Sequence, residues 1–508
     1  MTTNRRDTTI SITLFLLTLL SRIPFRSHIL YHWDSVNFAY AMREFDVARE
    51  QPQPPGYILY VWLCRAVDVL FHDPQTTMVT ISIVASGLAV VALFHLGRAM
   101  FGRATGLIAA LLLATSPLFW FYGEIALPHS LDTLLVILGL WWLYETMRGR
   151  THYLYPAILV LAVAGGVRQQ TLIFLAPLIL FALRRVGWRR FLAAGALGAV
   201  VCLAWFIPLM ASSGGISAYL DLTSKYTTRF NTSTSIFMGA GWWGLRRNLR
   251  KLTMYTLFGW SAGLLPFLAY GVVVLRRRQW PRNWEKSLFF ALWLAPTLLF
   301  YTLIHMGQQG LVFIFLPALL LWGARGLTAL FEKRHALVTL AGLLVALNAA
   351  IFCFLPEAPL PASNLRLLTR AALLNSDDYY NDRFAAIRSR FSPRSTAILA
   401  ANWHHVEYYL PDYPLIPLNV ASKWEPNAGR ISNPSGEERR ITIQDLGPVA
   451  TDRSVVHLIV FDPSLFPFND SQDFTQVISL PHHGEMEVLT LRKDQMLYCG
   501  DTFGIRPN

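Results

Sequence analysis

Long runs of apolar residues, separated by short basic stretches, dominate the first 355 residues of the chain. Most of these runs approach the length of about 20 residues that a helix needs to cross roughly 30 Å of hydrocarbon. By this length criterion the pattern predicts about eleven transmembrane helices. They are expected at residues 9–23, 78–97, 104–122, 126–147, 152–167, 169–183, 191–210, 253–275, 287–304, 309–327 and 335–355.

The composition agrees with this pattern. Of the 508 residues, 54% are hydrophobic and only 15% are charged, whereas roughly a quarter of the residues are charged in a typical soluble protein. We therefore expect a polytopic membrane protein. The first apolar run follows Arg5 and Arg6, as in a signal peptide, but no small-residue cleavage site comes after it. This favours an uncleaved first helix.

Charges in the loops predict the orientation of the chain. Segment 57–72 is apolar, but it contains Arg65 and Asp68 and follows two prolines. If this segment does not cross and the N-terminus is cytoplasmic, every short basic loop lies in the cytoplasm, as the positive-inside rule expects. The basic residues concerned are Arg98, Arg103, Arg148, Arg150, Arg184, Arg185, Arg189, Arg190, Arg276, Arg277, Arg278, Arg325, Lys333 and Arg334. We therefore expect 57–72 to form a helix that lies against the outer face without crossing.

The net charge of +13 is unevenly distributed. Residues 356–508 carry 14 Lys+Arg and 18 Asp+Glu, so the remainder of the chain carries +17. Such a basic balance can indicate nucleic-acid binding, but here the Arg clusters stand between apolar runs, where they orient a membrane protein. No nucleic-acid partner is expected.

In this orientation several polar residues gather on the outer face. Asp34 follows the first span, and Glu124 follows the third in "FYGEIALPHSLD". The outer loop 212–252 carries six basic residues against the single acidic residue Asp221. Anion binding would explain a basic loop on this side, and attraction to anionic lipid headgroups is the alternative. Further outer-face candidates are His129, Asp132, Arg168, His305 and Gln308.

The two carboxylates suggest acid–base chemistry. Asp34 can act as a general base that takes a proton from an acceptor hydroxyl, which suffices for a transfer with inversion. Its structural alternative is a solvated helix N-cap for 35–45. Glu124 can orient the acceptor or bind a metal, or it can simply end a helix. A divalent cation, with Asp34 and Glu124 as its candidate ligands, is left open. Arg168 is a candidate to neutralise a phosphate leaving group, together with Arg246, Arg247, Arg250 and Lys251 of the outer loop.

From about residue 360 the composition becomes that of an ordinary soluble domain. The stretches 395–400 and 455–461 predict buried strands, and 403–410 predicts a helix. Alternation on both sides of Lys493-Asp494, within 486–499, predicts a hairpin. The stretch 421–450 is typical of an irregular loop. In "NWHHVEYY" the pair His404 and His405 with Glu407 offers a weak metal-binding pattern.

Several function classes find no support in the sequence. There is no P-loop, no GxGxxG after a strand, no HExxH and no zinc-type spacing. The four cysteines lie far apart and include no CxxC pair. A nucleotide-fuelled pump or a nucleotide-sugar site is therefore not expected.

Four stretches have a recognisable order along the chain. They are "HWDSVNFA", "QPQPPGYILYVWL", "GRAMFGRATGLIAALLLATSPLFWFYGEIALPHSLD" and "GQQGLVFIFLPALL". In order and sidedness they resemble the GT-C superfamily of polyprenol-phosphate-sugar-dependent membrane glycosyltransferases, which includes aminoarabinose transferases and protein O-mannosyltransferases. The resemblance covers most of residues 10–330.

The resemblance implies a GT-C fold with Asp34 as catalytic base and Glu124 as a second acidic residue. The family's His before the double proline is Gln53 here, and its late basic residue is missing. The candidate substrate-binding residues are then Gln53, Tyr57, His129, Asp132, Arg168, Arg246, Arg247, His305 and Gln308.

These observations predict an α-helical transmembrane domain at 1–355, with outer loops at 24–77 and 212–252, and a small extracytoplasmic α/β domain at 356–508. The predicted function is a bacterial plasma-membrane glycosyltransferase that moves a sugar from a polyprenyl-phosphate donor to an acceptor hydroxyl with inversion. Membrane lipid and the lipid-linked donor are its expected partners. A lipid-substrate transporter or flippase, and an inactive membrane scaffold, are the alternatives.

Overall fold

The chain forms two compact units. The first, here called the helical unit, comprises Met1–His28 with Asn37–Leu373, and the second, the C-terminal unit, comprises Ile29–Val36 with Leu374–Asn508. The computed structural model describes residues 5–277, 283–360, 366–401, 403–417, 419–420, 429–432, 438–442, 455–462, 476–482, 484–490, 497–499 and 503–505.

The helical unit contains a helix in each of the predicted spans. Its long helices are α1 (Arg5–Arg22), α4 (Pro74–Phe101), α5 (Arg103–Thr115), α7 (His129–Met147), α8 (Leu154–Val167), α9 (Gln169–Leu183), α10 (Trp188–Ser212), α12 (Gly241–Trp260), α13 (Leu264–Arg277), α14 (Trp284–Leu303), α15 (Leu316–Leu330) and α16 (Arg334–Phe354). Within the described ranges, six helical stretches are long and apolar enough to cross a membrane by length and composition. Four shorter helices are apolar as well, so the predicted helical membrane fold is confirmed.

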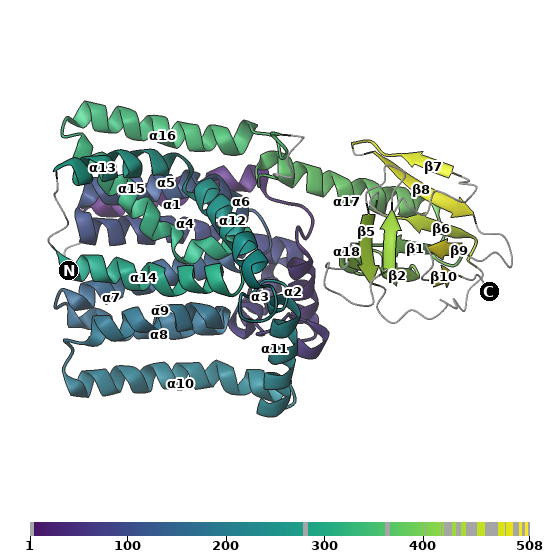
Figure 1. Cartoon of the computed structure of the whole chain (residues 1–508), viewed down its shortest axis with the longest axis horizontal. Coiled ribbons are helices and arrows are strands. Elements are labelled where there is room, and N and C mark those ends of the chain that lie inside the picture. Colours follow the sequence, from purple (N-terminus) through teal and green to yellow (C-terminus); the bar gives the residue numbers. More distant parts are fainter. Residues whose placement is uncertain are drawn as a thin grey trace. The chain divides into compact units, whose positions relative to one another are not determined.

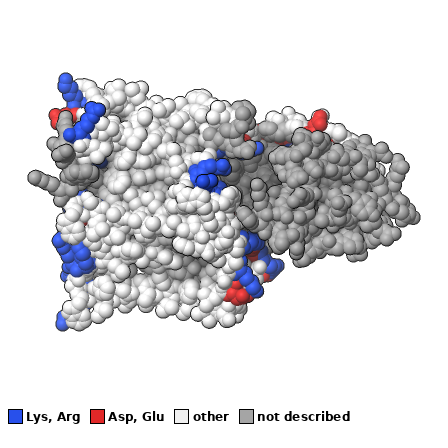
Figure 2. Space-filling model, in the orientation of Figure 1, with Lys and Arg blue, Asp and Glu red and all other residues white. Residues whose placement is uncertain are grey.

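The long helices lie side by side (Figure 1). The N-terminus lies at one end of the helical unit, and α3 (Ile58–Phe71) and α11 (Ile216–Asn231) lie at the other. On the face drawn in Figure 2, charged side chains of this unit gather toward its two ends, with a wide uncharged surface between them. This distribution is the one expected for a protein that sits in a bilayer, because charges are expensive in the hydrocarbon region.

Segment 57–72 forms the helix expected after the double proline. Its two charged residues are satisfied locally. Arg65 donates to the carbonyls of Ala41 (2.8 Å) and Met42 (3.0 Å) at the end of α2 (Trp33–Arg43), and Asp68 accepts a hydrogen bond from Thr77 (2.6 Å). These contacts explain how an apolar helix at this end of the helical unit retains charged side chains.

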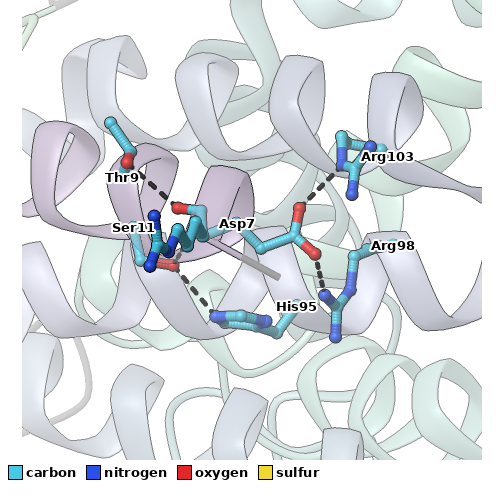
Figure 3. Close-up of polar contacts among 7 residues, drawn as sticks. Asp7, Thr9, Ser11, His95, Arg98 and Arg103 are labelled. Atoms are coloured by element: carbon cyan, nitrogen blue, oxygen red, sulfur yellow. Dashed lines mark hydrogen bonds and ion pairs between the residues drawn. The ribbon is translucent and has the colours of Figure 1, made fainter. Parts of the chain in front are cut away.

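The first helix is fixed at its N-terminal end by an ion-pair network (Figure 3). The buried carboxylate of Asp7 pairs with Arg98 at the end of α4 and with Arg103 at the start of α5, the latter at 2.6 Å. One turn further along α1, the Ser11 hydroxyl is hydrogen-bonded to His95 Nε2 at 3.0 Å. A single carboxylate therefore connects three helices.

Close helix contacts depend on small residues. A Cβ added to Gly106 of α5 would lie 2.5 Å from the Phe94 carbonyl oxygen of α4. Backbones that approach this closely are typical of membrane helix pairs built on glycine.

The C-terminal unit is a small α/β domain, as predicted. Its five-stranded sheet has the order β2-β1-β6-β8-β7. Strand β1 is parallel to both neighbours, whereas β8 is antiparallel to β6 and β7. The elements are α17 (Arg370–Arg390), β1 (Thr396–Ala400), α18 (Trp403–Tyr409), β2 (Leu415–Pro417), β6 (His457–Val460), β7 (Gln476–Ser479) and β8 (Glu485–Thr490).

The predicted hairpin around Lys493-Asp494 is wrong. Both edges of β8 are occupied by β6 and β7, while β9 (Leu497–Cys499) pairs with β10 (Phe503–Ile505). Alternation identified the strands, but a strand buried in the middle of a sheet takes its partners from distant sequence. The predicted irregular stretch 421–450 also contains regular structure, because β4 (Gly429–Ser432) and β5 (Glu438–Thr442) pair with β3 (Asn419–Val420) in a small sheet.

Replacement of Asp7 by Ala is expected to lower the free energy of unfolding by about 2 kcal/mol, because it leaves two arginines at a helix contact without their counter-charge. Thermal unfolding of the detergent-solubilised protein measures the loss. Thr9→Ala is the control, since Thr9 is exposed and its hydroxyl donates to the Arg5 carbonyl of the same helix. Equal stability of the two variants would contradict a structural role for the network.

Candidate functional site

Arg168 and Asp132, two of the predicted site residues, form a buried ion pair. Arg168 stands between α8 and α9, and its Nη1 lies 3.5 Å from Asp132 Oδ2. Its Nη2 donates to the Tyr301 hydroxyl (3.2 Å) and to Gln170 Oε1 (3.1 Å). Asp132 Oδ1 accepts a hydrogen bond from Thr171 (2.8 Å). Asp132 thus compensates the charge of Arg168 and orients its guanidinium.

The double-proline loop is held by α9 and α11. Gln169 Nε2 donates to the Pro55 carbonyl (3.2 Å) and to the Tyr219 hydroxyl (2.9 Å), and the same hydroxyl lies 3.0 Å from the Pro55 carbonyl. Gly56 follows with φ +112°, and a Cβ at this position would lie 2.6 Å from Leu209. The loop can therefore pass close to α10 only because it carries glycine here.

Gln53 and Tyr57 flank this loop. Gln53 is buried, and its side-chain oxygen accepts no hydrogen bond from the described part of the chain. Tyr57 has φ +44° and packs edge-on against Phe38, with 5.2 Å between the ring centroids. It also lies within electrostatic range of Arg168. The loop thus brings Tyr57 toward the buried ion pair.

A second group of predicted residues lies where α12 meets the segment after α14. Asn248 organises this contact. Its amide nitrogen donates to the carbonyls of Thr234 (3.0 Å) and Thr302 (3.3 Å), and its oxygen accepts the Met306 N–H (3.2 Å). The buried Asn248 therefore fixes the start of α12 against residues 302–306.

Basic side chains surround this contact. Arg247 donates to the Met306 carbonyl (3.2 Å), and Lys251 Nζ lies 3.5 Å from the Gly307 carbonyl. Figure 2 shows Lys and Arg gathered over α12. Helix α12 carries four cations, here called the α12 cation cluster: Arg246, Arg247, Arg250 and Lys251. Among the described residues, none of these four forms an ion pair with a carboxylate.

His305 is part of the same environment. Its Nδ1 is hydrogen-bonded to the Thr234 hydroxyl at 3.1 Å. Burial, reinforced by Arg247 and Lys251, lowers the pKa of His305 to about 4. The imidazole is therefore neutral at pH 7 and adds no charge to the cation cluster. Gln308 is the N-cap of the 3-10 helix η5 (Gln309–Ile314).

Glu124 is fully buried in the turn between α6 (Pro117–Tyr122) and α7. Its Oε1 accepts the indole N–H of Trp120 (2.8 Å), and the guanidinium of Arg22 lies over the same indole, 4.7 Å from the ring centroid. The Glu124 carbonyl accepts the Ser27 N–H (3.0 Å). Glu124 therefore fixes the end of α1 and the start of the first outer loop.

His129 opens α7 and is buried. Its ring packs edge-on against Tyr122, with 4.9 Å between the centroids, and a Cβ added to Gly310 would lie 2.5 Å from His129 Cδ2. The imidazole thus contacts the backbone of η5, the element that follows Gln308.

Glu124 is a poor ligand for a divalent cation. Electrostatic interaction with Arg22 reaches Glu124, and this positive charge opposes a second cation there. In the described portion of the chain, no group of three His, Cys, Asp or Glu side chains is arranged to hold a metal ion. His405, from the weak metal-binding pattern, instead bonds to a backbone carbonyl.

Asp34 belongs to the C-terminal unit, whereas Glu124 belongs to the helical unit. Helix α2 begins at Trp33, so Asp34 lies in its first turn and is not its N-cap. The Asp34 N–H donates to His32 Nδ1 (3.1 Å), and its Oδ2 lies 3.6 Å from the same nitrogen. A carboxylate in the first turn is stabilised by the helix dipole.

The segment before Asp34 is bound by α18. The Leu30 N–H donates to the Tyr409 hydroxyl (3.0 Å), and His405 Nε2 donates to the Leu30 carbonyl (2.6 Å). The rings of Trp33 and His404 lie 6.0 Å apart. The residues that carry the predicted base are therefore a structural part of the C-terminal unit.

Several of these contacts were not anticipated from the sequence. The sequence marks Gln169 as a possible site residue only by its position next to Arg168 in "GGVRQQ". Tyr219, Tyr301 and Asn248 come from separate helices, and no local pattern marks them.

The comparisons with known proteins agree with this architecture. Residues 52–211 match the family model described as dolichyl-phosphate-mannose-protein mannosyltransferase. Among curated proteins, none matches the sequence significantly.

Solved structures of ArnT from Cupriavidus metallidurans show the same fold. The apo state has a TM-score of 0.52 at 12% identity, covering 95% of this chain and 96% of that chain. The same protein bound to undecaprenyl phosphate has a TM-score of 0.50 at 13% identity, covering 82% and 86%. The apo oligosaccharyltransferase of Archaeoglobus fulgidus is less similar, with a TM-score of 0.47 at 12% identity, covering 81% of this chain and 64% of that chain. The ArnT structures thus confirm the fold expected from the resemblance to GT-C proteins.

The buried His405 predicts a pH dependence for the C-terminal unit. Burial lowers the pKa of His405 to about 3, against about 6.5 in an unfolded chain. Because the neutral form is favoured in the folded state, its stabilising contribution is complete above about pH 6.5 and is lost as the pH falls toward 3. We expect a loss of about 2 kcal/mol at pH 4.5, measured as faster amide exchange in α18 after correction for the intrinsic rate.

His405→Gln is the matched variant for this measurement, because its terminal amide can replace Nε2 as donor to the Leu30 carbonyl but does not titrate. The extra exchange between pH 7 and 4.5 should be smaller in this variant. An unchanged pH dependence would show that another group is responsible.

Proposed function

We propose that the chain is an integral membrane glycosyltransferase that transfers a sugar from a polyprenyl-phosphate donor to an acceptor hydroxyl on the extracytoplasmic face, with inversion. The match of residues 52–211 to a mannosyltransferase family and the ArnT fold support this class of activity. The observation that carries the proposal for the donor is the α12 cation cluster. In a bacterial plasma membrane, the N-terminus would be cytoplasmic and the C-terminal unit outside.

The cation cluster suits a phosphate. Arg247 and Lys251 are half-buried, and the hydrogen bonds they donate within the protein go to neutral carbonyls. Cations removed from water without a counter-charge are costly, so an anion that enters is stabilised strongly. Arginine offers paired donors to phosphate oxygens, and lysine adds a point charge. The ligand would be the phosphate of the polyprenyl donor.

The surroundings of the cluster suit a lipid tail. Trp242 and Trp243 at the start of α12 are 66% and 49% exposed, and Phe237 before them is 71% exposed. Aromatic side chains of this kind prefer the membrane interface. A donor whose phosphate is bound by α12 would therefore extend its apolar chain along lipid-facing surface.

The proposed reaction is a single displacement. Asp34 takes the proton from the acceptor hydroxyl while that oxygen forms a bond to C1 of the sugar. The bond between C1 and the phosphate oxygen breaks, and the polyprenyl phosphate leaves with the electron pair. The cation cluster stabilises the negative charge on the leaving phosphate. Attack on the face opposite the leaving group inverts C1.

The other predicted residues have supporting roles in this proposal. Arg168, oriented by Asp132, and Tyr57 would contact the polar part of the donor. Gln53 offers a buried amide oxygen that could accept a sugar hydroxyl. Glu124 would act by fixing Arg22 and the first outer loop, and His305 would contribute a neutral imidazole.

Asp34→Asn is expected to lower turnover by at least about 100-fold, because the amide cannot accept the proton. The assay measures undecaprenyl phosphate released from undecaprenyl-phosphate-linked hexoses and pentoses, tested one at a time with envelope membranes as the acceptor source. Asp221→Asn is the control, since Asp221 is exposed on α11 and forms a surface ion pair with Lys225. Retained turnover in Asp34→Asn would rule out Asp34 as the base.

The double variant Arg247→Met/Lys251→Met is expected to weaken binding of undecaprenyl phosphate by at least about tenfold, because two charge-assisted contacts are lost. Binding is measured with the purified protein in nanodiscs. Arg190→Met, at the exposed start of α10, is the control for a general loss of positive charge. Equal affinity of both variants would exclude the α12 cluster as the phosphate site.

A further inference from the structure

We propose that α18 of the C-terminal unit is the positioning element for Asp34, with Tyr409 and His405 as its positioning residues. This inference rests on the proposed function, in which Asp34 is the catalytic base. It assigns the C-terminal unit a role in catalysis itself, in addition to any role in recognising the acceptor.

Two side chains of α18 bind the backbone of Leu30, which lies in the segment that carries Asp34. Tyr409 accepts the Leu30 N–H at 3.0 Å, and His405 donates to the Leu30 carbonyl at 2.6 Å. Both polar groups of one peptide position are therefore occupied by side chains of one short helix. Such a pair of hydrogen bonds fixes the direction of the backbone as well as its position.

A hydrophobic contact supports the hydrogen bonds. Ile29 is 2% exposed and belongs to the same core as Tyr380 and Phe384 of α17 and Val406 of α18. His405 itself stacks on Tyr380, with 4.3 Å between the rings. The segment is thus built into the core of the C-terminal unit instead of resting on its surface.

Local hydrogen bonds connect the backbone at Leu30 to Asp34, four residues later. His32 accepts the Ser35 N–H through its carbonyl (2.8 Å) and the Asp34 N–H through its ring (3.1 Å). Trp33 lies against the ring of His404. The first turn of α2 therefore begins from a backbone that α18 holds, and the direction of the Asp34 carboxylate depends on it.

The loss of catalytic rate expected from a displaced Asp34 is large enough to measure. A general base must lie within hydrogen-bond reach of the proton it removes, and a displacement of about 1 Å at a reacting group can cost about 100-fold in rate. Loss of one of the two hydrogen bonds at Leu30 would loosen the segment without removing any group that touches the substrate.

The experiment uses the full-length protein in nanodiscs and compares Tyr409→Phe with Tyr413→Phe. The Tyr413 hydroxyl also donates a hydrogen bond inside the C-terminal unit, but its acceptor is the Phe391 carbonyl at 2.9 Å, outside the segment 29–36. Two quantities are measured: amide exchange at Leu30, and the kcat and KM for the lipid-linked sugar that the wild type turns over.

We expect Tyr409→Phe to raise exchange at Leu30 by roughly fivefold and to lower kcat by about tenfold, with KM for the donor unchanged. Tyr413→Phe should change neither. His405→Phe should resemble Tyr409→Phe, and His405→Gln, which keeps a donor near the Nε2 position for the Leu30 carbonyl, should restore most of kcat.

Two results would overturn the positioning role. One is faster exchange at Leu30 with an unchanged kcat. The other is an equal fall of kcat in Tyr413→Phe, which would indicate general destabilisation. Failure of the proposed function is seen separately, as full turnover by Asp34→Asn, and it does not affect the exchange measurement.

Discussion

A charge withdrawn from water must find a counter-charge or a set of donors and acceptors, and this constraint organises the helical unit. Asp7 is compensated by Arg98 and Arg103, and Arg168 by Asp132. Each of these pairs also fixes the relative position of two or more helices. The α12 cation cluster differs in its density, because it places four positive charges on neighbouring turns of one helix. Among the described residues its contacts are to neutral carbonyls and an aromatic ring, and none is an ion pair with a carboxylate. Several neighbouring cations without a counter-charge favour the binding of an anion.

Much of the helical unit follows directly from the sequence. Spans of sufficient length and apolarity specify helices almost independently of context, since only a helix satisfies its own backbone in hydrocarbon. The double proline followed by Gly56 marked the start of α3, and the basic residues of 212–252 marked the cation cluster. These features are local, so a local pattern was enough to find them.

The contacts between distant elements could not be read in this way. Tyr219 and Pro55 are 164 residues apart, and Asn248 bonds to residues on both sides of it in the chain. Strand β8 likewise pairs with β6 and β7, and not with β9, which follows it in the sequence. Hydrophobic alternation gives the faces of a strand, but the identity of its neighbours depends on how the whole core is filled.

The attachment of Ile29–Val36 to the C-terminal unit has a consequence for biosynthesis. Leu30 emerges from the ribosome well before its partner Tyr409, which follows 379 residues later. At a synthesis rate of roughly 5–20 residues per second, this is a delay of about 20 to 75 s. During that interval the segment 29–36 lacks its contacts with α18. The protein can therefore acquire a complete Asp34 environment only after the C-terminal unit has been translated and folded.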